Sequence, residues 1–166
     1  MARISERLQK INLSLNKLNS IPFVIVFTSI LYIVSFSSNF ILGFIKQNDH
    51  ILIDFHSKGE NFVLIYVVPL FFAPVFETFL GQSLPYFLLK KIRFLNEKSY
   101  LILIISAVIF GLLHFYSLFY MIYAFLIGIV LMYAYMVRVK SHKNAFLLVA
   151  ICHSLLNLGI IIKNLL

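Results

Sequence analysis

Long apolar runs separated by short polar segments, most of them basic, make up most of this chain. The run from Ile21 to Ile45 has 25 residues without Asp, Glu, Lys or Arg, more than the ~20 residues that a helix needs to cross a bilayer. Asn61 to Leu89 is a second run with one charged residue, Glu77, and Asn144 to Ile162 is the last. Each of these runs is predicted to form a transmembrane helix.

The run from Ser99 to Val137 is too long for one membrane crossing. It has 39 residues without a charged side chain, and at ~1.5 Å per residue such a helix would be nearly twice as long as the hydrocarbon layer is thick. Two helices with a tight turn near Tyr116 and Ser117 are therefore predicted. Because a backbone in lipid must satisfy its own hydrogen bonds, the chain is expected to be all-α, a polytopic bundle of about five transmembrane helices.

Residues 2 to 18 predict an amphipathic helix before the first span. Ile4, Leu8, Ile11 and Leu15 recur at helical spacing with basic residues between them, as in helices that lie on a membrane surface. The apolar run that follows is too long for a cleavable signal peptide and has no small-residue cleavage site. No internal repeat or low-complexity linker divides the sequence, so residues 1–166 are expected to form a single integral membrane domain.

The basic residues give the five-span arrangement a direction. With five spans, most of them fall before the first span or in the loops at the same end of the bundle: Arg3, Arg7, Lys10, Lys17, Lys90, Lys91, Arg93, Lys98, Arg138, Lys140 and Lys143. Lys46, Lys58 and Lys163 fall at the other end. Because cytoplasmic loops are enriched in Lys and Arg, the N-terminus is predicted to be cytoplasmic and the C-terminus outside, in a multi-pass protein of the cell membrane.

Composition excludes two other classes of protein. Hydrophobic residues make up 61% of the chain and charged residues only 12%, about half the charged fraction of a soluble domain, so membrane lipid must solvate most of the surface. The net charge of +8 does not indicate nucleic acid as a partner, because the basic residues lie at the ends of apolar runs and form no base-reading pattern.

Three ionisable side chains lie within the predicted spans, each on a different one: Glu77, His114 and His153. Such residues are costly in lipid and are functional candidates by default. Asn157 follows His153 by four residues and therefore shares its helix face, as His114 does with Phe110. The three ionisable residues lie at similar depth from the basic end of the bundle, and we expect them to surround one polar cavity with Asn157.

The span that contains Glu77 also contains three prolines, Pro69, Pro74 and Pro85. A proline lacks the amide donor of a regular helix and clashes with the carbonyl four residues earlier. Broken helices at membrane depth are tolerated where they line a protein-buried or wet cavity. The prolines therefore favour a cavity beside Glu77, with an ordinary kinked helix as the alternative.

Three motifs follow one another along these spans: Ala73-Pro74-Val75-Phe76-Glu77-Thr78-Phe79-Leu80-Gly81-Gln82, Phe110-Gly111-Leu112-Leu113-His114 and His153-Ser154-Leu155-Leu156-Asn157. Their order and spacing resemble the motifs of the CPBP family of intramembrane proteases (CAAX-processing and bacteriocin-processing, or Abi-type). That family has two glutamates followed by three residues and an arginine, then Phe-x-x-x-His, then His-x-x-x-Asn. The resemblance implies a CPBP-like core at about residues 62–162.

The first motif departs from the family pattern. With Glu77 aligned to the first glutamate, Thr78 replaces the second glutamate and Gln82 replaces the arginine. Aligning Glu77 with the second glutamate would instead put Phe76 and Gly81 at polar positions, so the first alignment is preferred. In either alignment one carboxylate and one guanidinium of the family are missing together, and Thr78 and Gln82 are assigned supporting roles.

The resemblance implies water attack on a peptide bond. Glu77 would act as general base on a water that His114 orients, and His153 and Asn157 would donate hydrogen bonds to the developing oxyanion, with Phe110 in support. A mechanism without metal is preferred, because the chain lacks the His-Glu-x-x-His motif of zinc proteases. The alternative is a zinc ion bound by Glu77, His114 and His153, which is an acceptable ligand set.

Two functions follow from the resemblance. The first is an intramembrane endopeptidase acting on a peptide or a membrane-protein substrate, with no cofactor or with zinc. The second is a non-catalytic membrane protein that acts in bacteriocin immunity or as a regulatory partner, which the altered first motif favours. A small transporter would be expected to have repeat symmetry, and the sequence has none.

Overall fold

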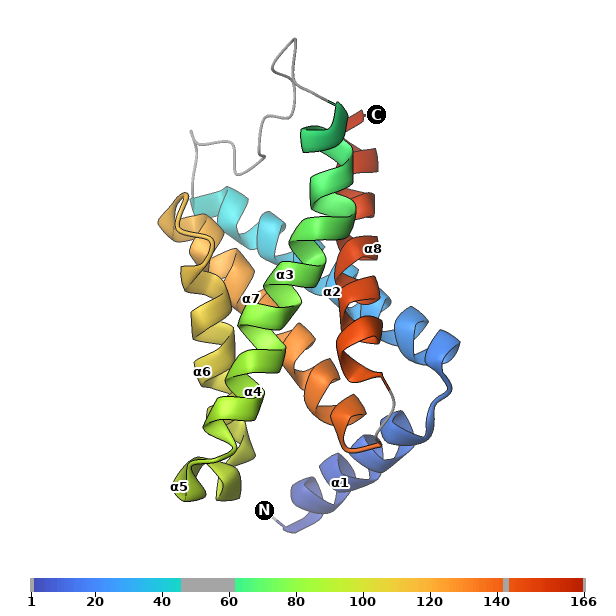
Figure 1. The fold of residues 1–166 in the computed structure, drawn as a ribbon, viewed down its shortest axis with the longest axis vertical. Coiled ribbons are helices and arrows are strands. Elements are labelled where there is room, and N and C mark those ends of the chain that lie inside the picture. The colour runs from blue at the N-terminus through green and yellow to red at the C-terminus, as the bar shows by residue number, and fades with distance from the viewer. Residues whose placement is uncertain (1, 46–61, 142–143, 166) are drawn as a thin grey trace.

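The apolar runs fold into helices packed side by side, in a computed structural model that describes residues 2–45, 62–141 and 144–165 (Figure 1). These residues contain no strand, in agreement with the all-α prediction. Their elements in chain order, with η for a π-helical segment, are α1 (Ala2–Lys17), α2 (Ser20–Ile45), η1 (Val63–Phe72), α3 (Ala73–Thr78), η2 (Phe79–Ser83), α4 (Leu84–Leu89), α5 (Arg93–Glu97), α6 (Ser99–Leu112), α7 (Leu118–Val139) and α8 (Ala145–Leu165).

Four helices of the described residues are long and apolar enough to cross a membrane. They comprise 24 residues of α2, the 27 residues from Val63 to Leu89, the 22 residues of α7 and 19 residues of α8. The apolar helix α6 has 14 residues, which at ~1.5 Å per residue reaches about two thirds of the way across the hydrocarbon layer. A bundle of about five apolar helices is therefore confirmed, and the fifth is shorter than a full span because the predicted turn takes up residues 113–117.

The helix from Val63 to Leu89 alternates between π and α register, and its prolines explain why. A π turn is wider than an α turn and accommodates residues that interrupt the regular ladder. In η1 the amide of Ala73 donates to the carbonyl of Val68, five residues earlier. The next amide in this register would belong to Pro74, which has none. The carbonyl of Pro69 is therefore left without a backbone donor.

Close contact between α6 and α7 depends on glycine. A Cβ added to Gly111 would lie 3.0 Å from the carbonyl oxygen of Met121, and one added to Gly128 would lie 3.0 Å from Cβ of Phe110. Phe110 is fully buried, and its ring also covers Gly81 of η2, where an added Cβ would lie 2.5 Å from Cδ2. The Phe110 ring thus fills the junction of α6, α7 and η2, where small residues let three helices approach.

Helix α2 is joined to two other helices by tyrosine hydroxyl groups. The hydroxyl groups of Ser35 and Tyr123 lie 2.8 Å apart, which links α2 to α7. The Tyr32 hydroxyl donates to the carbonyl of Leu155, which links α2 to α8. The Tyr32 ring occupies the space that a side chain at position 159 would take, so a larger residue than Gly159 would have to displace this ring.

The two ends of the bundle differ in charge. Figure 1 shows the N-terminus, α5 and the first turn of α6 at one end and the C-terminus at the other. Basic residues of the segments at the first end are Lys10, Lys17, Lys90, Lys91, Arg93, Lys98 and Lys140. Lys163 lies in the last turn of α8, at the other end; Lys46, Lys58 and Lys143 lie outside the described residues. The predicted distribution of charge is present, and which side of the membrane each end faces stays a prediction.

Arg138 lies in the last turn of α7, not in the loop where it was predicted, and its side chain is fully buried. One guanidinium nitrogen donates to the carbonyl of Leu18 at 2.7 Å and another to Oγ of Ser20 at 3.3 Å. The guanidinium also lies 4.7 Å from the centre of the Phe23 ring. Because these residues join α1 to α2, Arg138 holds the N-terminal helix against the bundle. That helix covers Ala2–Lys17, as predicted, and its position on a membrane surface stays a prediction.

Candidate active site

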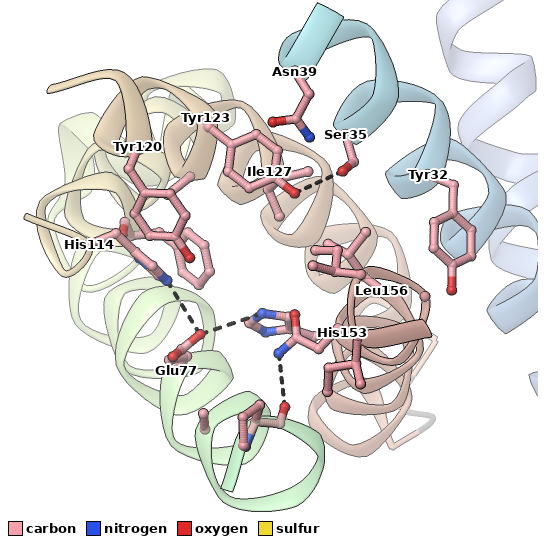
Figure 2. A pocket seen from close by; sticks show the side chains of 18 of the residues that line it. Tyr32, Ser35, Asn39, Glu77, His114, Tyr120, Tyr123, Ile127, His153 and Leu156 are labelled. Atoms are coloured by element: carbon pink, nitrogen blue, oxygen red, sulfur yellow. Dashed lines mark hydrogen bonds and ion pairs between the residues drawn. The ribbon is translucent and has the colours of Figure 1, made fainter. Parts of the chain in front are cut away.

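Helix α3, the α6–α7 turn and helix α8 bring Glu77, His114 and His153 together inside the bundle (Figure 2). Oε2 of Glu77 lies 3.6 Å from Nε2 of His114 and 3.5 Å from Nε2 of His153. The exposed fractions of the three side chains are 28% for Glu77, 12% for His114 and 5% for His153. One carboxylate oxygen is thus shared by two imidazoles, and the carboxylate is the most open of the three groups.

The hydrogen bonds of His114 show which ring nitrogen carries the proton. Nδ1 lies 2.8 Å from the carbonyl oxygen of Phe110, and since a carbonyl only accepts, Nδ1 carries a proton. In the neutral ring Nε2 is then an acceptor, and it faces Glu77. His114 lies just beyond the end of α6 rather than within a helix, and its amide donates to the carbonyl of Gly111 at 3.0 Å. The Phe-x-x-x-His spacing therefore sets the tautomer of the ring.

An ionised carboxylate and a neutral Nε2 that face each other are both acceptors. They repel unless a donor satisfies them, and a water molecule beside them can donate one O–H to each. A water held in this way directs its oxygen lone pairs away from both groups and toward open space. Glu77 and His114 can therefore bind, orient and deprotonate a water molecule.

His153 approaches the same oxygen from α8. Its Nδ1 is buried and has no hydrogen-bond partner among the described residues. Its ring packs edge-on against Phe110, with 5.6 Å between the ring centres. With the proton on Nε2, His153 can donate a hydrogen bond to Glu77 or to a group bound beside it.

Asn157 lies one turn beyond His153 and supports a different helix. Its Nδ2 donates to the carbonyl of Pro69 at 2.9 Å, the carbonyl that Pro74 leaves without a backbone donor. One N–H of the amide is thus committed to η1, and the other remains available to a ligand. Asn157 therefore has a structural role in addition to the role that the family resemblance implies.

The four predicted site residues line one cavity of about 520 Å³, a volume in the range of ligand and substrate sites. Its walls also contain polar and aromatic side chains from α2 and α7, labelled in Figure 2: Tyr32, Ser35, Asn39, Tyr120 and Tyr123. The structure thus brings Glu77, His114, His153 and Asn157 around one polar cavity, whereas their catalytic roles stay predictions.

None of the α2 residues of the cavity is among those predicted from the sequence. Tyr32, Ser35 and Asn39 recur at spacings of three and four in a span that also contains other Ser and Thr residues, and this spacing places the three on one helix face. That polar stripe is a signal that could have identified them. Tyr120 and Tyr123 carry no such signal, because aromatic residues occur throughout the apolar runs.

The three residues predicted to support the site have different surroundings. Phe110 provides the carbonyl that accepts the hydrogen bond of His114, and its ring fills the junction of α6, α7 and η2. Thr78 and Gln82 are fully buried and do not line the cavity. Oγ1 of Thr78 and both polar side-chain atoms of Gln82 lack a hydrogen-bond partner among the described residues. These two side chains therefore face the packed interior.

A metal ion was the alternative for this cluster. Within residues 2–45, 62–141 and 144–165, no group of three or more His, Cys, Asp or Glu side chains has an arrangement that could hold a metal ion. Glu77, His114 and His153 have the right chemistry for zinc. The zinc alternative therefore stays a prediction, as does the mechanism without metal.

Comparison with known families agrees with the resemblance that the motifs carry. A model of the family described as type II CAAX prenyl endopeptidase Rce1-like matches residues 59–159, more than half of the chain. The chain belongs to this family. The Rce1-like match runs from just before η1 to the second-last turn of α8 and contains Glu77, His114, His153 and Asn157. Comparisons with curated proteins and with solved structures found no match.

Membership of the Rce1-like family and the long apolar helices identify a multi-pass membrane protein of a protease family. Helix α2 lies outside the matched residues, yet it supplies one wall of the cavity. The catalytic candidates therefore belong to the shared part of the family, whereas part of the surrounding wall comes from a segment that the family match does not include.

Proposed function

We propose that this chain is an intramembrane endopeptidase that hydrolyses a peptide bond with a water activated by Glu77 and His114. The observation that carries the proposal is the position of one carboxylate oxygen within 3.6 Å of two imidazole nitrogens, inside a cavity of the bundle. A base, an orienting acceptor and a donor then surround one point. Its substrates are proposed to be peptides or segments of membrane proteins.

In the first step Glu77 takes a proton from the bound water as the water oxygen attacks the peptide carbonyl carbon. Nε2 of His114 accepts a hydrogen bond from the other O–H of the water, which keeps this hydrogen, and so fixes the orientation of the water. The carbonyl π electrons move to the oxygen, which becomes an oxyanion. Nε2–H of His153 and the free N–H of Asn157 donate hydrogen bonds to that oxyanion.

In the second step the tetrahedral intermediate collapses. The oxyanion electrons re-form the carbonyl, the C–N bond breaks, and Glu77 returns its proton to the leaving nitrogen. The products are a carboxylic acid and an amine, and Glu77 is again ionised. No other reactant is consumed besides water.

Glu77→Gln tests this mechanism. The amide is nearly isosteric with the carboxylate but cannot accept the proton, so cleavage is expected to fall by ~10²–10⁴. The assay uses purified protein in detergent micelles and a library of quenched fluorescent peptides. Glu97→Gln is the matched control, because it makes the same chemical change outside the cavity. The Glu97 side chain is 66% exposed and lies 3.6 Å from that of Arg93.

Wild-type cleavage that survives in Glu77→Gln would exclude the glutamate mechanism. Loss of cleavage on adding a zinc chelator, with recovery on adding zinc, would instead favour the zinc alternative. If neither the wild type nor any variant cleaves a peptide, the non-catalytic function is favoured. The observation that favours the non-catalytic function is that two neutral residues, Thr78 and Gln82, replace the family's carboxylate and guanidinium.

We also propose that the N-terminus faces the cytoplasm and the C-terminus the outside. The enrichment of basic residues at the end of the bundle that contains the N-terminus supports this orientation. Reporter fusions after Leu18 and after the last residue are expected to report opposite sides, with the first fusion cytoplasmic. Two fusions on the same side would contradict it.

A further inference from the structure

Tyr120 lies in the first turn of α7 and lines the cavity next to the water-activating pair. Oγ of Ser117 accepts a hydrogen bond from the Tyr120 amide at 3.1 Å, a side-chain cap that fixes this turn. The Tyr120 ring centre lies 5.5 Å from that of His114, 5.7 Å from that of Tyr116 and 5.9 Å from that of Tyr123. The cap and these three rings hold Tyr120 in one orientation.

The hydroxyl groups of the two cavity tyrosines of α7 differ in their partners. The Tyr123 hydroxyl is paired with Ser35 at 2.8 Å. The Tyr120 hydroxyl makes no hydrogen bond to another described residue, and Figure 2 shows it turned toward His114 and Glu77. A phenol O–H is therefore available at the site and has no partner in the part of the chain that the structure describes.

The other donors at the site are partly committed. Asn157 gives one of its two N–H groups to the carbonyl of Pro69. Nε2 of His153 lies 3.5 Å from Glu77, which competes for its proton. The motif residues therefore offer the oxyanion two donors, one of which Glu77 competes for, and a further pre-oriented donor would add to them.

We propose that Tyr120 is a further catalytic residue, whose hydroxyl donates a hydrogen bond to the substrate carbonyl oxygen as that oxygen gains negative charge. This inference rests on the proposed peptidase function. The attacking water needs acceptors for its two hydrogens, which Glu77 and His114 provide, and it must keep a lone pair free to attack. A third group beside it that is a donor is therefore useful to the carbonyl oxygen and not to the water.

The test is Tyr120→Phe, which keeps the ring and its contacts and removes only the hydroxyl. Loss of one oxyanion-hole donor costs ~10²–10³ in kcat where it has been measured in a serine protease, so a fall in kcat of that order is expected with KM nearly unchanged. Tyr133→Phe is the matched control, because Tyr133 is on the same helix and its hydroxyl donates to Asn12 at 2.6 Å, away from the cavity. It is expected to retain wild-type kcat.

A binding comparison separates transition-state stabilisation from folding and from substrate binding. A phosphinate analogue of the cleaved peptide mimics the tetrahedral oxyanion, and a reduced-amide analogue has no carbonyl oxygen. Tyr120→Phe is expected to weaken the phosphinate by the same factor as kcat and to leave the reduced amide unaffected. Equal weakening of both analogues, or none of either, would overturn the proposal.

The outcomes also separate this inference from the function on which it rests. If Glu77→Gln is inactive and Tyr120→Phe retains full kcat, the peptidase proposal stands and the role of Tyr120 is wrong. If Glu77→Gln retains activity, or the wild type cleaves no peptide, the mechanism fails and the role of Tyr120 fails with it. A rise in KM without a fall in kcat contradicts the oxyanion role alone.

Discussion

Polar side chains on adjacent positions of the α3–η2 helix have opposite surroundings. Glu77 faces the cavity, where His114 and His153 approach the same carboxylate oxygen. Thr78 and Gln82 face the packed interior, and their side-chain polar atoms have no partner among the described residues. The first region, called here the cavity face, holds a charge with partners; the second, called here the interior face, holds neutral groups without them.

The comparison separates side chains that serve the candidate site from side chains that only affect the stability of the fold. An unpartnered buried polar group destabilises a fold by ~1–3 kcal/mol. Thr78 and Gln82 on the interior face therefore lower the stability of the protein, although neither side chain lines the cavity. In the family motif a carboxylate and a guanidinium occupy these positions and can neutralise each other. Their joint replacement leaves the interior face uncharged while the cavity face keeps its carboxylate.

The largest expected effect comes from returning one charge to the interior face. Gln82→Arg buries a guanidinium without a partner and is expected to lower the free energy of unfolding by ~3–5 kcal/mol. Thr78→Glu in the same chain supplies a carboxylate four residues away and should recover most of that loss. Unfolding by SDS titration of the two single variants and the double variant measures the coupling. An additive double variant would show that the two positions do not face each other.

A smaller loss of stability is expected when the hydrogen bond between Asn157 and the Pro69 carbonyl is removed. Asn157→Ala leaves the Pro69 carbonyl without a donor and should cost ~1–3 kcal/mol of unfolding free energy. Pro74→Ala restores the amide that the carbonyl lacks, so Asn157→Ala should cost less in a Pro74→Ala background. The double-mutant cycle is read from the same SDS titrations. Equal costs in both backgrounds would mean that Asn157 does not serve this carbonyl.

The smallest effect has the opposite sign. Thr78→Val is nearly isosteric and removes a buried hydroxyl that has no partner among the described residues. It is expected to raise the free energy of unfolding by about 1 kcal/mol, with cleavage retained. A melting temperature in detergent below that of the wild type would indicate that the hydroxyl has a partner, such as a bound water.

Much of the fold follows from the sequence because lipid imposes a simple rule on it. A charge-free run must be helical, and its length sets the number of crossings, so the helices and the turn near Tyr116 were predictable. The end of α6 at Leu112 was not predictable, because Leu112 and Leu113 are as apolar as the residues before them and do not mark where the turn begins. Arg138 was placed in a loop because a charge next to a span normally faces water.

The site was predictable where its residues are rare and hidden where they are common. Glu77, His114 and His153 stand out because ionisable groups are scarce in lipid. The link between Asn157 and Pro69 depends on the π register of η1, which local sequence does not specify. Tyr120 resembles the other tyrosines until its neighbours are known.

The buried Arg138 also has a consequence for how the chain is made. Its partner, the Leu18 carbonyl, is 120 residues away in the sequence. At the ~5–20 residues per second of synthesis, the N-terminal helix leaves the ribosome on the order of ten seconds before its anchor exists. During that interval α1 has only the membrane or the insertion machinery to hold it. Its docking is therefore a late event of biogenesis, which can begin only after most of α7 has been synthesised.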